Sequence, residues 1–185
     1  MDEDRLKHSY GVAIKMKEIG KNMQLNADEI EDLFLLGLNH DIGYEFSENG
    51  VNHNKIGGLI LKKNGYKFWR EVYYHGILTS EYDSLYLRIL NQADMQIDKY
   101  GNDVGYEKRL EDIAGRYGKD SVVYKRCMEM INTFSRANSK NNESEMEPEL
   151  LFRQIAFVPA TNKSKRYIYN HTSLWIVTWQ PFYSK

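Results

Sequence analysis

The chain has 185 residues with a hydrophobic fraction of 42%, which is enough for one domain with a buried core and a small appendage. A formal net charge of −1 provides no global field that would attract nucleic acid or an anionic membrane. The apolar runs are too short to span a bilayer, the first residues lack a signal-peptide pattern, and a single cysteine excludes an intrachain disulfide, so we expect a cytoplasmic protein.

Up to about Phe134 the sequence predicts a series of helices. His8 lies on the same side of the first helix as Val12 and Ile19. Asn26 is typical of a helix N-cap, and that helix is expected to end at Gly43. Four later segments carry apolar residues at helical spacing, namely Asn52 to Gly65, Phe68 to His75, Leu87 to Ile97, and Val123 to Phe134.

The composition changes after Phe134. Residues 135–147 are polar and lack aromatics, which indicates a linker between a helical domain (1–134) and an appendage (148–185). Three β-branched and aromatic segments of the appendage predict strands, at residues 152–158, 166–170 and 174–179. Its many aromatic side chains must dock either on the helical body of the same chain or across a dimer, and we expect a homodimer contact.

Histidines and carboxylates in the helical part indicate a metal site. His40 and Asp41 are adjacent at a helix end, and both side chains can reach one ion there. Asp94 interrupts an apolar stripe, and a buried carboxylate needs a metal or, alternatively, a structural ion pair with Arg or Lys or the N-terminus of a partner helix. His75 shares a predicted helix face with Phe68 and Val72, which fits a ligand and a satisfied core histidine equally well.

Taken in order, six residues resemble the ligand series of the HD-domain superfamily of metal-dependent phosphohydrolases: His8, His40, Asp41, His53, His75 and Asp94. Residues 40–43 match the form "HDIG" by which one large branch is known. Segments 5–12, 53–60 and 89–94 look like that family's first histidine helix, its post-HD helix and its closing "AD" segment. The resemblance covers about residues 5 to 134.

This resemblance implies an all-α, HD-domain-like helical bundle over about residues 4–134, with the β-strand appendage outside it. It implies one ion held by His8, His40, Asp41 and Asp94. The presence of both intermediate histidines resembles the branch with two metals, in which Asp41 bridges and His53 and His75 hold the second ion. One or two divalent transition-metal ions (Fe, Mn, Co, Ni or Zn, with Mg as a further option) are therefore expected.

The expected reaction is hydrolysis of a phosphoester of a nucleotide or another small phosphorylated metabolite by metal-activated water. Asp41 is the central catalytic residue in this hypothesis. Lys55 is a candidate phosphate contact, for which a solvated lysine is the simpler alternative, and Glu45 is a candidate acid or base, for which the alternative is a naturally acidic surface loop. A di-iron oxygenase on the same scaffold and a non-catalytic metal- or nucleotide-sensing domain remain alternatives. Strong nucleic-acid signals are absent from the sequence.

Overall fold

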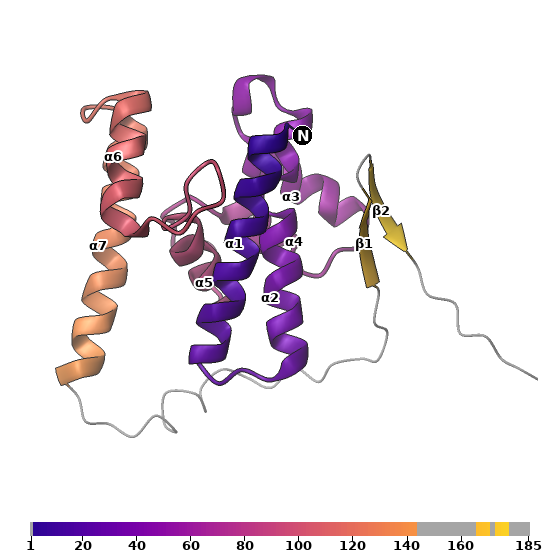
Figure 1. The fold of residues 1–185 in the computed structure, drawn as a ribbon, viewed down its shortest axis with the longest axis horizontal. Helices are drawn as coiled ribbons and strands as arrows, with labels where there is room; N and C mark the ends of the chain where they lie inside the picture. The colour runs from indigo at the N-terminus through magenta and orange to yellow at the C-terminus, as the bar shows by residue number, and fades with distance from the viewer. Residues whose placement is uncertain (1, 144–165, 171–172, 178–185) are drawn as a thin grey trace, which may run out of the picture. The chain divides into compact units, whose positions relative to one another are not determined.

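The computed structural model describes residues 2–143, 166–170 and 173–177. The chain divides into two compact units, Met1–Asn141 and Asn142–Lys185. Within its described residues the first unit is built from helices, as predicted for an all-α body (Figure 1). These are α1 (Glu3–Asn22), α2 (Ala27–Asn39), α3 (His53–Lys63), α4 (Trp69–Tyr74), α5 (Leu85–Asp94), α6 (Gly105–Tyr117) and α7 (Val122–Glu143), with two short 3-10 turns, η1 (Ile42–Phe46) and η2 (Glu48–Gly50).

Helices α1 and α2 form an antiparallel pair (Figure 1). The N-cap predicted at Asn26 is present as a full capping box, in which the Asn26 side chain accepts from the Glu29 N–H and the Glu29 carboxylate accepts from the Asn26 N–H. Gly37 lies directly against Ala13, where a Cβ on Gly37 would be 2.5 Å from the Ala13 Cα. This backbone contact sets the distance between the two helices, and with it the distance between His8 and His40.

Helix α5 packs against α1, and the core of the helical body lies among α1, α2 and α5. Burial of these apolar side chains is the main favourable contribution to its stability. The side chains are at most 4% exposed and belong to Val12, Ala13, Met16, Leu33, Leu36, Leu87, Ile89, Leu90 and Ala93.

Gly43 allows the turn after α2 to lie against the start of α3. A Cβ at Gly43 would collide with the carbonyl oxygen of His53 and would come within 2.6 Å of the Gly57 backbone nitrogen. The glycine therefore brings the His40–Asp41 segment next to His53 through backbone contact. Helix α2 ends at Asn39 as judged by its hydrogen bonds, a few residues before the predicted stop.

The prediction that His75 points inward is confirmed, since His75 is 3% exposed and Val72 is fully buried, but the helix predicted over Phe68 to His75 is one residue shorter at each end. Helix α4 spans only Trp69–Tyr74, and His75 follows its end with an extended backbone (φ −61°, ψ 145°). The ψ of His75 already ends the helix, and Gly76 follows with a φ of +70°, which glycine adopts readily. Side chains from other helices bind the backbone here, as described below.

Helix α7 continues to Glu143, so the first nine residues of the segment expected as a linker are helical. In the second unit, β1 (Arg166–Asn170) and β2 (Ser173–Val177) pair antiparallel, with Ile168 opposite Trp175. The strand expected at residues 152–158 lies outside the described residues. The strand-rich appendage, its boundaries and its dimer contact therefore stay predictions.

We expect Gly43→Ala to lower the free energy of unfolding by about 1–3 kcal/mol, because the added methyl group forces the turn away from α3. Gly115→Ala is the control. Gly115 is an exposed interior position of α6, and no atom lies within 4 Å of the place that an alanine methyl group would take, so alanine there should be neutral or stabilising. Urea denaturation measures both, and equal stability of the two variants would contradict the close-contact role of Gly43.

Candidate metal centre

The fold brings all six predicted ligand residues together, each from the end or first turns of a helix. His8 lies in the second turn of α1, His40 and Asp41 follow α2, His53 begins α3, His75 follows α4, and Asp94 ends α5. Four are nearly inaccessible, with exposures of 2% for His8, 0% for His40, 3% for Asp41 and 3% for His75. The side chains of His53 (24%) and Asp94 (22%) form the more open side.

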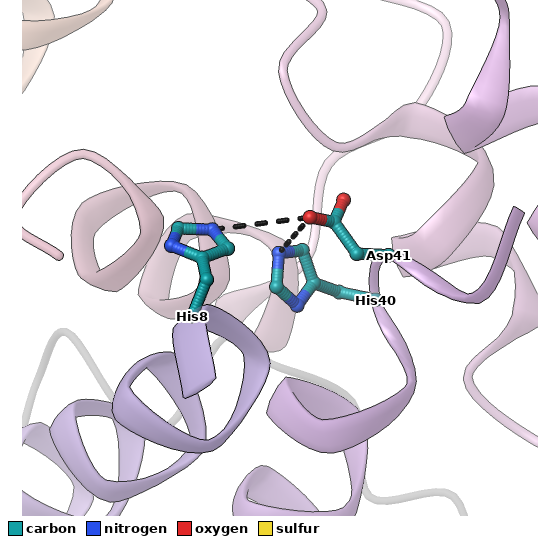
Figure 2. A group of neighbouring side chains, drawn as sticks. All are labelled: His8, His40 and Asp41. Atoms are coloured by element: carbon teal, nitrogen blue, oxygen red, sulfur yellow. Dashed lines mark ion pairs between the residues drawn. The ribbon is translucent and has the colours of Figure 1, made fainter. Parts of the chain in front are cut away.

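The Asp41 carboxylate lies at the centre and uses each oxygen for a different pair of histidines. Its Oδ2 is 3.9 Å from Nε2 of His8 and 3.5 Å from Nε2 of His40, and Figure 2 shows both rings turned toward that oxygen. Its Oδ1 is 3.5 Å from Nε2 of His53 and of His75. Asp94 joins the first pair, with Oδ1 at 3.0 Å from Nε2 of His8 and 4.0 Å from that of His40.

Each of the four imidazoles places Nε2 toward the carboxylates and is oriented by a backbone carbonyl at Nδ1. The Nδ1 atoms of His40, His53 and His75 lie 2.7, 2.9 and 2.7 Å from the carbonyl oxygens of the residues three positions earlier, Gly37, Gly50 and Val72. His8 Nδ1 is 2.9 Å from the carbonyl oxygen of Asp98, which follows α5. A carbonyl oxygen can only accept, so Nδ1–H donates and Nε2 faces the carboxylates. Metal-binding histidines are commonly oriented in this way.

The atoms that face one another in this site are acceptors, which favours a cation among them. Nε2 of His40 is fully buried and has no hydrogen-bond partner among the described residues. Such a buried acceptor is costly unless it is satisfied. Two groups place their ligand atoms within 4.8 Å of one another, one formed by His8, His40 and Asp41 and the other by Asp41, His53 and His75.

The separations also fit ligands of a shared ion. Ligand atoms at ~2.0–2.2 Å from a transition metal, with angles near the tetrahedral value, lie ~3.4 Å apart. The 3.5 Å contacts of Asp41 with His40, His53 and His75 match that spacing and are longer than a good hydrogen bond. The donor set of imidazole and carboxylate suits divalent transition metals. The residues present therefore fit one or two such ions.

The pKa values of His40, His53 and Asp41 favour the forms that bind metals, whereas burial lowers the pKa of His75 and its contact with Asp41 more than offsets this and raises it. Burial lowers the pKa of His40 to about 4, so its ring is neutral at pH 7. Burial raises the pKa of Asp41, but the adjacent His40 ring, the His75 ring and the Arg5 guanidinium more than offset this and hold it well below its usual value. Burial and the nearby His75 lower the pKa of His53. Neutral imidazoles and ionised carboxylates are the forms that bind metals.

Arg5 is the nearest cation to Asp41. Its Nη1 donates to Asp41 Oδ2 at 2.7 Å, and its guanidinium lies 3.7 Å from the centre of the Tyr44 ring. Tyr44 in turn stacks on His53, with ring centres 4.0 Å apart and an interplanar angle of 27°. Burial and the charge of Asp41 raise the pKa of Tyr44 to about 12, so the phenol stays neutral. The Arg5 side chain is 25% exposed and lies on the border of the site.

Arg109 of α6 is a site residue that the sequence reasoning missed. It is 8% exposed, donates from Nη1 to Asp112 at 3.0 Å, and places Nη2 4.0 Å from Asp94 Oδ1. The alternative of an ion pair for Asp94 is therefore present alongside its contact with His8. The helical spacing of Tyr106, Leu110 and Ile113 would have predicted α6, and Arg109 lies next to that stripe.

Lys55 and Glu45, the two other predicted catalytic residues, differ from the buried cluster in their exposure. Lys55 lies in the first turn of α3 and Glu45 in η1, and both side chains are exposed. Their catalytic roles stay predictions.

The model of the HD domain family matches residues 5–96, a segment that contains all six clustered residues. No curated protein and no solved structure gives a significant match. The chain belongs to the HD-domain superfamily, whose members are generally metal-dependent hydrolases. The match ends before α6, so the resemblance expected up to residue 134 is supported only to residue 96. Among the described residues, no helix is long and apolar enough to cross a membrane.

In the metal-free protein at pH 7, we expect His40 and His53 to be neutral with the proton on Nδ1, because a carbonyl accepts from that nitrogen and burial lowers both pKa values. Long-range proton–nitrogen correlation spectra distinguish the two tautomers. A proton on Nε2 of His40 would contradict the ligand orientation.

We expect Arg109→Gln to destabilise the metal-free protein by about 1–3 kcal/mol, because Asp94 loses a compensating charge. The metal-loaded protein should lose less, since an ion would supply that charge. The rise in melting temperature on adding metal should therefore be larger in the variant than in the wild type. Arg116→Gln removes another Asp112 contact from the same helix, and it should leave this difference unchanged.

Proposed function

We propose that this protein is a dinuclear metal-dependent phosphohydrolase that cleaves a phosphoester of a nucleotide or another small phosphorylated metabolite. The observation that carries the proposal is the shared Asp41 carboxylate, which directs one oxygen at His8 and His40 and the other at His53 and His75. In this assignment Asp94 completes the ligand set of the first ion.

The open side of the cluster supports a catalytic site over a purely structural one. A structural metal site is closed by protein ligands, whereas a catalytic site leaves positions for water and substrate. The second group offers three protein ligands, Asp41, His53 and His75, and the His53 side chain is 24% exposed. Two divalent ions, when bound, would lower the pKa of a water nucleophile and neutralise charge on the phosphoryl oxygens.

Charge supports an anionic substrate. Without ions, the carboxylates of Asp41 and Asp94 are balanced by the guanidiniums of Arg5 and Arg109. Each divalent ion therefore adds net positive charge to the site, and a phosphate ester is complementary to it.

We assign Arg5 to the binding of a phosphoryl oxygen. Its guanidinium is held by one bond to Asp41 and by the Tyr44 ring, and it presents several N–H donors, of which the Asp41 contact uses one. Stacking fixes the plane of the guanidinium, which reduces the entropy lost when a phosphate binds to it. Lys55 and Glu45 are proposed as a further phosphate contact and as the acid that protonates the leaving group. A cytoplasmic location and a homodimer through residues 148–185 belong to the same proposal.

The first test is elemental analysis of purified protein, followed by phosphate-release assays on phosphorylated metabolites with Mn, Fe, Co, Ni and Mg. We expect metal-dependent hydrolysis. Oxygen consumption with iron and no phosphate release with any of these metals would favour the di-iron oxygenase instead.

Asp41→Asn should reduce hydrolysis at least ~100-fold, about 2.7 kcal/mol in the barrier, because the amide cannot bridge two cations. Circular dichroism should remain near that of the wild type. Asp32→Asn is the control, since Asp32 makes a surface ion pair with Lys67. A rate for Asp41→Asn of at least half the wild-type value would rule out the bridging role.

A further inference from the structure

We infer that Asn54 and Asn91 are positioning residues that hold His75 in place for the second ion. The inference rests on the proposed dinuclear site and adds two residues that touch neither the ion nor the substrate. It starts from the irregular backbone at the end of α4.

At this point the chain leaves the helix while placing a ligand. Helix α4 ends at Tyr74, His75 is extended, and Gly76 has a φ of +70°. The last carbonyls of a helix have no partner within it and must find one elsewhere. Without such partners the peptide groups around His75 would be free to move.

Asn54 binds two of these carbonyls. Its side-chain Nδ2 donates to the carbonyl of Tyr73 at 3.1 Å and to that of His75 at 3.2 Å. Asn54 is the second residue of α3 and directly follows His53 in the chain. Asn54, the neighbour of the ligand His53, therefore fixes the backbone of the ligand His75.

Asn91 binds the next peptide group. Its Oδ1 accepts from the Gly76 N–H at 2.9 Å, and Asn91 is only 8% exposed. Asn91 lies on α5, three residues before Asp94, which is about one helical turn. The carbonyl oxygen and the N–H of the His75–Gly76 peptide are thus hydrogen-bonded to α3, which carries His53, and to α5, which carries Asp94.

This matters because the His75 ring follows its backbone. Nδ1 of His75 is bound to the Val72 carbonyl at 2.7 Å, and Nε2 is 3.5 Å from Asp41 Oδ1. Metal–ligand distances tolerate only ~0.2 Å. A small shift of the peptide groups would therefore move Nε2 out of range, and a preorganised ligand needs a supporting shell of this kind.

The two asparagines have opposite hydrogen-bonding roles, so the same substitution separates them. Asn54→Asp replaces a donor by an acceptor that faces two carbonyl oxygens, and both bonds are lost. Asn91→Asp keeps an acceptor for the Gly76 N–H. Aspartate has nearly the shape of asparagine, and both variants add one negative charge, so a weaker second ion in Asn54→Asp alone would point to the lost hydrogen bonds.

The experiment is calorimetric titration of metal-free full-length protein with Mn²⁺, with ion content checked by elemental analysis after gel filtration. We expect two ions for the wild type and for Asn91→Asp. Asn54→Asp and Asn91→Leu should bind the first ion normally and the second at least ~10-fold more weakly. Asn64→Asp is the matched control, because the Asn64 side chain donates to the Ile60 carbonyl at the exposed end of α3. It should bind two ions.

Several outcomes would overturn the inference. If Asn54→Asp binds both ions with wild-type affinity, the positioning role fails while the dinuclear proposal stands. Equal weakening in Asn54→Asp and Asn91→Asp would assign the effect to charge rather than to hydrogen bonding. A wild-type protein that binds a single ion would refute the dinuclear proposal and this inference with it. Should Asn54→Asp fail to fold, Asn54→Ser removes at least one of the two bonds, and an unchanged affinity for the second ion there counts against the inference.

Discussion

The buried carboxylate of Asp41 is the constraint on which the site depends. It is 3% exposed, and an isolated charge at such a place would be strongly unfavourable. Four imidazoles and the Arg5 guanidinium surround it. These side chains come from helix ends and first or second turns, where the backbone leaves the regular helix and can direct neighbouring side chains at one point. The site therefore lies where the ends of several helices meet.

Ring orientation and ring position have different origins. His40, His53 and His75 each bind the carbonyl three residues earlier, a bond that short-range backbone geometry alone provides. Their positions depend on packing, above all on the contacts of Gly37 with Ala13 and of Gly43 with the start of α3. His8 differs, because its Nδ1 partner, Asp98, is far away in the chain. Three ligands are thus oriented locally, and the fold has to bring them together.

The sequence predicted those parts of the protein that show apolar residues at helical spacing or ligand residues in the order of a known family. Apolar spacing located the helices other than α6 and the inward position of Leu87 and Leu90, and the ordered histidines and aspartates identified the family. It failed where tertiary contacts override the period. His75 matches a helical face in the sequence, but the helix ends one residue before it. The contacts of Asn54 and Asn91 join backbone groups distant in the chain, and hydrophobic patterns carry no information about them.

The helical body has an apolar core in addition to the site, and this bears on what a metal would do here. Small zinc domains fold only when the ion is bound, because they bury too little apolar surface without it. In this chain, Met16, Leu33, Leu36 and Leu90 are fully buried apolar side chains. Arg5 and Arg109 further compensate the two carboxylates when no ion is present. The apolar core and these ion pairs contribute stability without an ion, so a folding role alone does not explain six clustered ligand residues.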